Sequence, residues 1–327
     1  MEKLIVSSSP HIHDKNTTQT IMRDVLIALS PAAVAGVVLF GLRALAVILA
    51  CVISAVLSEF LFNLICKKEQ TVFDLSAVVT GLILALCLPS KVEIWQCVIG
   101  SAFAIVVVKC LFGGIGCNFA NPAATARVFL LSAFAESING SVAARFMAPE
   151  LVGGSTPLAV ISQGSEVGFP SVANMFLNTH EGLPSIVDML FGVHGGAIGE
   201  TCIIALVLGG LYLIIRRVIA WEVPVTYLAT IFVLSLIVDR NVTVALYQVL
   251  GGGAVIAAFF MITDYVSTPV NKLGKIVFAF GCGAVTMLIR FSGVYPEGAS
   301  IAILIMNILA PYIEKLCKAK PLGKVGK

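Results

Sequence analysis

Charged residues are scarce in this chain of 327 residues, since Asp, Glu, Lys and Arg together make up only 12% of it. An ordinary soluble domain contains about 25% of these residues. The 21 basic and 18 acidic residues leave a formal net charge of +3, and the basic ones are scattered along the chain. This composition excludes a soluble globular domain, a disordered chain and a nucleic-acid-binding protein.

Metal-binding and catalytic motifs are also absent. None of the nine cysteines forms a C-x-x-C pair and most lie in apolar runs, which favours buried free thiols over an iron–sulfur cluster. His11 and His13 lie on a polar tail, where a metal role is weakly supported. There is no P-loop, no complete dinucleotide fingerprint and no hydrolase motif. We therefore predict neither catalytic residues nor a metal site in this chain.

Apolar residues, in contrast, make up 58% of the chain, and the mean hydropathy is +1.01. These values are typical of an all-α polytopic membrane protein. The sequence predicts about ten transmembrane helices, two of which (75–89 and 122–136) are short and rich in small residues, as in broken or half-length helices. The ten apolar stretches are 25–41, 43–66, 75–89, 93–111, 122–136, 199–215, 221–238, 243–263, 276–290 and 298–314.

The basic residues indicate an orientation. With ten crossings and a cytoplasmic N-terminus, most Lys and Arg residues outside the spans fall on the cytoplasmic side. The outer side receives only Arg43, Lys91, Arg145, Arg240 and Arg290. Because cytoplasmic loops of membrane proteins carry the excess of basic residues, we expect both termini in the cytoplasm.

The same reading divides the chain into five parts. A cytoplasmic segment (1–24) precedes a first group of five helices (25–136), and a long extracytoplasmic loop (137–198) precedes a second group (199–316). A basic cytoplasmic tail (317–327) ends the chain. Polar and Gly/Pro interruptions fall at corresponding places in the two halves, and an odd number of spans per half gives the halves opposite orientations. The two halves are therefore predicted to form inverted five-helix repeats.

Polar clusters at the predicted membrane boundaries offer candidate sites. The segment 113–127 contains Gly114, Asn118 and Asn121, which suit close approach and hydrogen bonding to the edge of a heterocycle. The alternative is a helix start with Asn121 as cap and proline in the first turn. Asp74 and Asp264 are candidates for an ion path or, alternatively, for helix caps.

The long loop contains the run Gly153-Gly154-Ser155-Thr156-Pro157. Taken by itself, this run predicts a glycine turn, a Ser/Thr cap and a proline at the first helical position.

Five segments together resemble one known family, which contains the D subunit of the Rnf complex and the B subunit of the sodium-pumping NADH:quinone reductase. They occur in the family's order along essentially the whole chain. The segments are SSSPHIHDKNTTQTIMRDVLIALSPA, GGIGCNFANPAATARVF, GGSTPLA, ITDYVSTPV and YPEGASIAILIMNILAPYI.

The resemblance implies a ten-span fold similar to that of urea transporters, with FMN joined by a phosphoester to a threonine. Thr156 matches that threonine and Gly154 matches the motif's glycine. Glu150, Gly153 and Ser155 depart from the family's pattern, which weakens the match to a flavin transferase substrate. A second, noncovalent flavin, riboflavin, is implied near Asn118 and Asn121.

We therefore expect a membrane flavoprotein subunit that carries electrons in a ferredoxin:NAD oxidoreductase and takes part in Na⁺ or H⁺ export. The resemblance implies a bacterial inner-membrane location, with the FMN loop on the outer face. Its implied partners are the complex's subunits A, B, C, E and G and a flavin transferase, besides the lipid bilayer. The alternative, suggested by the inverted repeat alone, is a channel or secondary transporter without a redox cofactor.

Overall fold

The computed structural model describes residues 17–139, 156–162, 183–292 and 297–317. All regular elements in these ranges are helices, which confirms the all-α prediction. The expectations for Gly153, Gly154 and Ser155, for the two tail histidines and for the tail after Cys317 lie outside the described residues.

Helices coincide with each of the ten predicted apolar stretches. The first group contains α1 (Thr18–Phe40), α2 (Leu42–Ile65), α3 (Ser76–Leu86), α4 (Ile94–Ala102) with the π-helix η2 (Phe103–Cys110), and α5 (Pro122–Ala133). The second contains α10 (Ile203–Ile215), α11 (Glu222–Asp239), α12 (Val242–Leu250), α13 (Ala254–Ile256) with the π-helix η3 (Ala257–Met261), α14 (Lys272–Phe291) and α15 (Ala299–Leu316). Short connecting helices are η1 (Val72–Asp74), α6 (Ala135–Asn139), α7 (Pro157–Ser162) and α9 (Ile186–Phe191).

Helix α1 begins at Thr18, before the start of the apolar stretch predicted at 25–41. Thr17 is its N-cap, and the Thr17 side chain accepts a hydrogen bond from the Thr20 amide at 3.2 Å. This cap lets the polar residues of the first turn join the helix. Hydropathy alone did not detect that turn.

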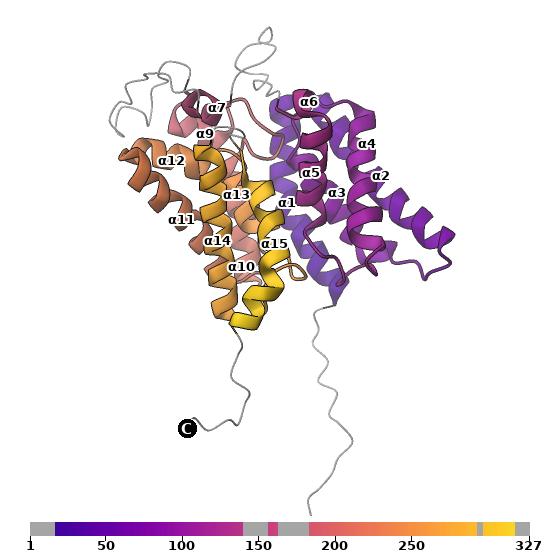
Figure 1. Cartoon of the computed structure of the whole chain (residues 1–327). Helices are drawn as coiled ribbons and strands as arrows, with labels where there is room; N and C mark the ends of the chain where they lie inside the picture. Colours follow the sequence, from indigo (N-terminus) through magenta and orange to yellow (C-terminus); the bar gives the residue numbers. More distant parts are fainter. Residues whose placement is uncertain (1–16, 140–155, 163–182, 293–296, 318–327) are drawn as a thin grey trace, which may run out of the picture.

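The two groups of helices lie side by side (Figure 1), with α1 against α10 and α5 against α15. Both ends of the main helical body, at the start of α1 and the end of α15, lie at one end of the bundle, whereas α6, α7 and α9 lie at the other (Figure 1). The start of α1 and the end of α15 therefore lie on one side, and the described elements of the long loop lie on the opposite side.

Five of the helices in the described residues are long and apolar enough to cross a membrane, namely α1, α2, α11, α14 and α15. The bent pair α12 and α13–η3 raises this number to six if it forms one span. The helices α3, α4–η2 and α10 are apolar but shorter. The described chain is thus a multi-pass membrane protein with several short or interrupted helices.

Glycines allow close contact between neighbouring helices. A Cβ atom at Gly81 of α3 would lie 2.9 Å from the Cys51 carbonyl oxygen of α2. A Cβ at Gly283 of α14 would lie 2.7 Å from the Thr230 Cβ of α11. Small residues at helix interfaces are the usual means of close packing in membranes, where lipid tails are as apolar as the side chains.

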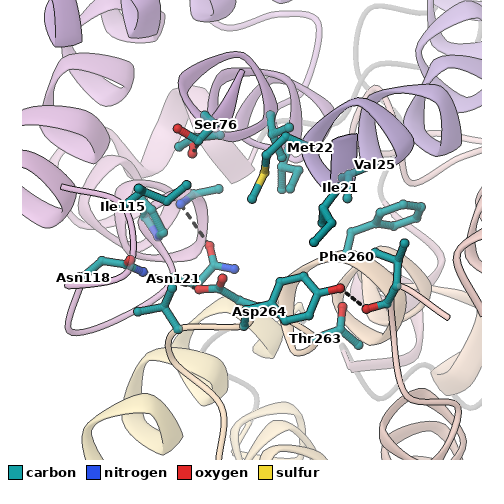
Figure 2. Close-up of a pocket in the computed structure, with 18 of the residues that line it drawn as sticks. Ile21, Met22, Val25, Ser76, Ile115, Asn118, Asn121, Phe260, Thr263 and Asp264 are labelled. Atoms are coloured by element: carbon teal, nitrogen blue, oxygen red, sulfur yellow. Dashed lines mark hydrogen bonds between the residues drawn. The ribbon is translucent and has the colours of Figure 1, made fainter. Parts of the chain in front are cut away.

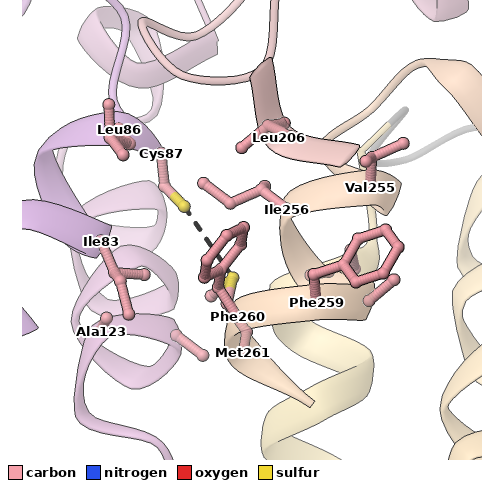
Figure 3. Close-up of a cluster of buried hydrophobic side chains, with 14 of the residues drawn as sticks. Ile83, Leu86, Cys87, Ala123, Leu206, Val255, Ile256, Phe259, Phe260 and Met261 are labelled. Atoms are coloured by element: carbon pink, nitrogen blue, oxygen red, sulfur yellow. Dashed lines mark hydrogen bonds between the residues drawn. The ribbon is translucent and has the colours of Figure 1, made fainter. Parts of the chain in front are cut away.

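A layer of apolar side chains joins the two groups at the bundle centre (Figure 3). Two residues of α3, Ile83 and Leu86, pack against α13 and η3 of the second group, and so does Cys87, which directly follows α3. The Cys87 thiol donates to the Met261 sulfur at 3.9 Å. This buried contact holds the end of one short helix against the π-helical end of another.

The bent span turns by 61° between α12 and α13–η3. Gly252 and Gly253 have φ values of 65° and 66°, a conformation that favours glycine. The guanidinium of Arg290 on α14 donates to the Gly251 and Gly252 carbonyl oxygens, both at 3.2 Å. The break therefore leaves backbone carbonyl oxygens without intrahelical partners, and an arginine from a neighbouring helix donates hydrogen bonds to them.

Candidate functional site

A cavity of about 390 Å³ lies between the two groups of helices, near the end of the bundle that holds the start of α1 (Figure 2). Pockets for small ligands and cofactors in proteins usually have volumes of about 300–1,000 Å³ and mostly apolar walls with a few polar groups. This cavity fits both criteria. Its lining residues are Thr18, Ile21, Met22, Val25, Ser76, Val79, Thr80, Ile83, Lys109, Ile115, Gly116, Asn118, Asn121, Pro122, Ala123, Leu213, Val218, Ile219, Phe259, Phe260, Thr263, Asp264, Tyr265 and Val266.

Asn121 forms part of the cavity wall and is also the N-cap of α5. Its Oδ1 accepts from the Ala123 and Ala124 amides at 3.0 and 3.1 Å. Its Nδ2 donates to the Met261 carbonyl at 3.0 Å, across the boundary between the two groups. The cap predicted as an alternative is therefore present. The amide has donor and acceptor partners within the protein.

Asn118 meets Asp264 from the other group at the same wall (Figure 2). Its Nδ2 donates to the Ala120 carbonyl at 3.0 Å and to Asp264 Oδ2 at 3.4 Å. No described residue donates to the Asn118 Oδ1, so this oxygen is available to a ligand. The structure thus brings together two candidates that are far apart in the sequence.

Asp264 lies in the connection between η3 and α14. Its Oδ2 also accepts from the Ser267 hydroxyl at 2.9 Å. Burial raises the pKa of the Asp264 carboxyl, and the hydrogen bonds from Ser267 and Asn118 oppose that rise by favouring the charged form. Asn307 of α15 connects this turn to the α5 cap. In the amide orientation that satisfies both neighbours, its oxygen accepts from the Asn121 N–H at 2.9 Å and its nitrogen donates to the Ser267 carbonyl at 3.2 Å.

Two other predicted residues lie outside the cavity lining. Gly114 lies in the turn before Asn118 with φ +95°, and its neighbour Gly116 is the glycine that lines the cavity. Asp74 ends η1, but Leu75 follows it as the N-cap residue of α3, and no side chain caps that helix. The helix-cap alternative for Asp74 is therefore wrong, because Leu75 occupies the N-cap position of α3.

Sequence reasoning missed a buried ion pair beside the cavity. The Lys109 ammonium in the π-helix η2 donates to both carboxylate oxygens of Glu59 on α2, at 2.8 and 2.9 Å, and to the Ser76 hydroxyl at 2.7 Å. Thr71 also donates to Glu59 at 2.6 Å. The sequence signal for this ion pair was the presence of one Glu and one Lys within apolar stretches, since charged residues within membrane spans usually pair with one another.

Thr156 lies at the start of α7, at the opposite end of the bundle from this cavity (Figure 1). The Thr156 side chain is half-buried, and its hydroxyl accepts from the Ala159 amide at 3.2 Å. Pro157 is buried at the first helical position. Leu158 packs against Gly251 and Gly252 at the break of the bent span. The cap and proline predicted here are confirmed.

An all-helical bundle with membrane-spanning helices, interrupted spans and a cavity between two groups defines a polytopic membrane protein. The chain belongs to the NQR2, RnfD, RnfE family, whose model it matches over residues 5–323. The resemblance seen in the five segments is thereby confirmed.

Its relatives have similar lengths. The D subunit of the Na⁺-translocating ferredoxin:NAD⁺ oxidoreductase complex of Acetobacterium woodii is 45% identical, over 98% of this chain and 95% of the relative. The D subunit of the proton-translocating ferredoxin:NAD⁺ oxidoreductase complex of Clostridium ljungdahlii is 37% identical, over 97% and 96%. The D subunit of the ion-translocating oxidoreductase complex of Methanosarcina acetivorans is 31% identical, over 99% of each chain.

The buried pair predicts a double-mutant effect. Lys109→Met should destabilise the protein by about 3–5 kcal/mol, because it leaves the Glu59 carboxylate buried without its cation. Lys109→Met combined with Glu59→Gln should recover most of this loss. Thermal unfolding of the purified variants in one detergent measures both effects. Additive losses in the double variant would show that the two charges are not coupled.

Proposed function

We propose that this chain is the D subunit of an ion-translocating ferredoxin:NAD oxidoreductase and carries flavin in two places. The observation that carries the proposal is the match to D subunits of such complexes over nearly the full length of both chains. The other subunits (A, B, C, E and G) are its partners. They supply the iron–sulfur clusters and the nucleotide-binding steps, for which this chain has no motifs.

The membrane arrangement that we propose has ten crossings in two inverted five-helix repeats. The ten helical segments and the short or bent helices in both groups support it. The placement of both ends of the helical body opposite α6, α7 and α9 supports cytoplasmic termini and an outer position for Thr156.

Thr156 is the residue proposed to hold FMN covalently. Its hydroxyl lies at a helix start at the surface of the bundle and is half-buried, so a transferase has access to it. The phosphodiester would retain one negative charge, which amide groups at a helix N-terminus favour. Leu158 anchors this helix to the break of the bent span, so the attached group would be held close to the bundle.

The cavity is the proposed site of the noncovalent flavin. Its volume and apolar walls fit a flat heterocyclic ring, and the free Oδ1 of Asn118 fits a donor on the ring edge. When bound, a flavin supplies electron transfer. The chain's own residues exclude water around the ring through Phe259, Phe260 and Ile83, and they fix its edge through Asn118.

The ion path is proposed to include Asp264 rather than Asp74. Asp264 lies on the cavity wall and contacts residues of both groups, whereas Asp74 does not line the cavity. A carboxylate at such a position attracts a cation when a ligand in the cavity becomes more negative.

The covalent site is tested by Thr156→Ala. Wild-type protein should be fluorescent on a denaturing gel, and mass spectrometry should find one FMN adduct on the peptide containing Thr156. The alanine variant should lose the adduct and still insert, because Thr156 lies outside the long helices. Thr268→Ala, in the other Ser-Thr-Pro sequence, is the matched control and should keep it. Colourless wild-type protein would favour the channel or transporter alternative.

The cavity is tested by Val79→Phe. The larger ring should occupy the cavity and reduce the acid-extractable flavin at least about tenfold, while the acid-resistant flavin on Thr156 stays unchanged. Val78→Phe is the matched control, since Val78 does not line the cavity. An unchanged ratio of the two flavin fractions in folded Val79→Phe protein would show that this cavity does not bind the noncovalent flavin.

The orientation is tested by thiol labelling. In a variant with Cys66→Ser and Cys117→Ser, which removes the two exposed thiols, an impermeant reagent should label Cys317 in inverted vesicles only. Adding Ala135→Cys on the exposed face of α6 should give labelling in intact cells. Labelling of Cys317 in intact cells would show that the orientation is the reverse of the one proposed, with Thr156 on the cytoplasmic side.

A further inference from the structure

The large cavity has two polar ends of different character. Ser76, the first residue of α3, lines it together with Lys109 of η2. Figure 2 shows Ser76 and Asp264 on opposite sides of the cavity. One polar end is therefore formed by Ser76 and Lys109, and the other by Asp264 and its partner Asn118.

The Lys109 ammonium gives the first end a positive charge. Lys109 lines the cavity whereas its partner Glu59 does not, so the cation rather than the carboxylate borders the space that a ligand fills. Only 4% of the Lys109 side chain and 1% of the Glu59 side chain are exposed. Such burial strengthens the effect of a charge on its neighbours, because the surroundings screen it less than water does.

Lys109 has no hydrogen left for a ligand, but Ser76 has one. Of the three ammonium hydrogens, two bind the Glu59 oxygens and the third binds Ser76 Oγ at 2.7 Å. Because Ser76 Oγ accepts from Lys109, its own hydrogen points elsewhere, and no described residue accepts that hydrogen. The buried Ser76 hydroxyl is thus a donor available to a ligand in the cavity, and the bond from the cation polarises it.

The start of α3 adds to the positive end. The first amides of a helix have no intrahelical acceptors and carry the positive end of the helix dipole. No side chain caps these amides in α3. At the start of α5, which borders the same cavity, Asn121 accepts from two of the first amides. The uncapped start of α3 is therefore the helix end that favours a negative atom of a ligand.

The two ends select the polarity of the ligand. An acceptor atom with negative charge suits the end at Ser76, whereas the oxygens of Asp264 and Asn118 suit donors. Lys109 disfavours a cation at its own end. A flavin ring has acceptor atoms and a ring N–H along its edge, and reduction by two electrons with uptake of one proton gives it one negative charge. The polarity of the cavity therefore matches the reduced ring better than the oxidised ring.

We propose that Ser76 donates a hydrogen bond to the part of the bound flavin that becomes negative on reduction, and that the Lys109–Glu59 pair acts through Ser76 to favour the reduced form. Ser76 is then a specificity-determining contact, and Lys109 and Glu59 are positioning residues. This inference rests on the proposed noncovalent flavin and adds which form the cavity binds more tightly. In the proposed complex, ferredoxin supplies the two electrons and water supplies the proton.

The test uses the full-length chain with Thr156→Ala, which removes the signal of the covalent flavin. Riboflavin is the probe. Its dissociation constant is measured for the oxidised form and, without oxygen, for the form reduced by dithionite. Each further variant is compared by the ratio of the two affinities, because a general loss of cavity shape weakens both forms, whereas a change in charge stabilisation acts mainly on the reduced form.

Ser76→Ala should weaken binding of the reduced form at least about tenfold more than binding of the oxidised form, since hydrogen bonds to charged atoms are the stronger ones. A tenfold change in this ratio equals a fall of about 30 mV in the two-electron reduction potential. Ser76→Thr, which keeps the hydroxyl, should retain the ratio. Ser54→Ala is the matched control, because the Ser54 hydroxyl is similarly buried but donates to the Val98 carbonyl and does not line the cavity.

The double variant Lys109→Met with Glu59→Gln tests the pair separately. It removes both charges together, so that no unpaired charge is left buried. It should also lower the ratio at least about tenfold, because Ser76 is no longer polarised by a cation. A pair that only stabilises the fold would leave the ratio unchanged. This variant keeps the proposal falsifiable if Ser76→Ala does not fold.

Ratios like that of the parent chain in both Ser76→Ala and the double variant would overturn the proposal, and so would an equal fall in Ser54→Ala. In those cases riboflavin still binds, and the proposed flavin site stands. A parent chain that binds neither form of riboflavin would overturn the noncovalent flavin site and this inference together.

Discussion

Interrupted helices within a membrane protein impose the constraint on which the rest of this structure depends. Each helix end leaves backbone amides or carbonyls without intrahelical partners, and lipid supplies none. Side chains at the helix ends and from neighbouring elements meet this need. Arg290 binds the carbonyls at the break of the bent span, and Asn121 caps α5. Glu200 accepts a hydrogen bond from the amide of Gly253, the N-cap residue of α13.

These same bonds also join the two groups of helices. Asn121 of the first group donates to the Met261 carbonyl of the second, and Asn118 donates to Asp264. The cavity lies where these contacts meet, so most of its walls come from helix ends and the connections beside them. A site built in this way has polar groups at one edge and apolar residues elsewhere, which suits a ring with a hydrogen-bonding edge.

Two further contacts are made at the glycine break of the bent span. Leu158 of α7 packs on Gly251 and Gly252, while Glu200 accepts a hydrogen bond from the Gly253 amide. The helix that starts at Thr156 and the buried Glu200 carboxylate therefore meet at one element, the glycine break.

The sequence by itself determined the membrane class, the positions of the helices and the family, because hydropathy, short capping patterns and motifs are properties of neighbouring residues. It also supplied the caps at Asn121 and Thr156. Only the tertiary structure decided that Lys109 pairs with Glu59, that Asn118 meets Asp264 and that Glu200 binds the Gly253 amide. These partners belong to different helices or connections. Which of them meet depends on how the two groups pack, and no local pattern encodes that packing.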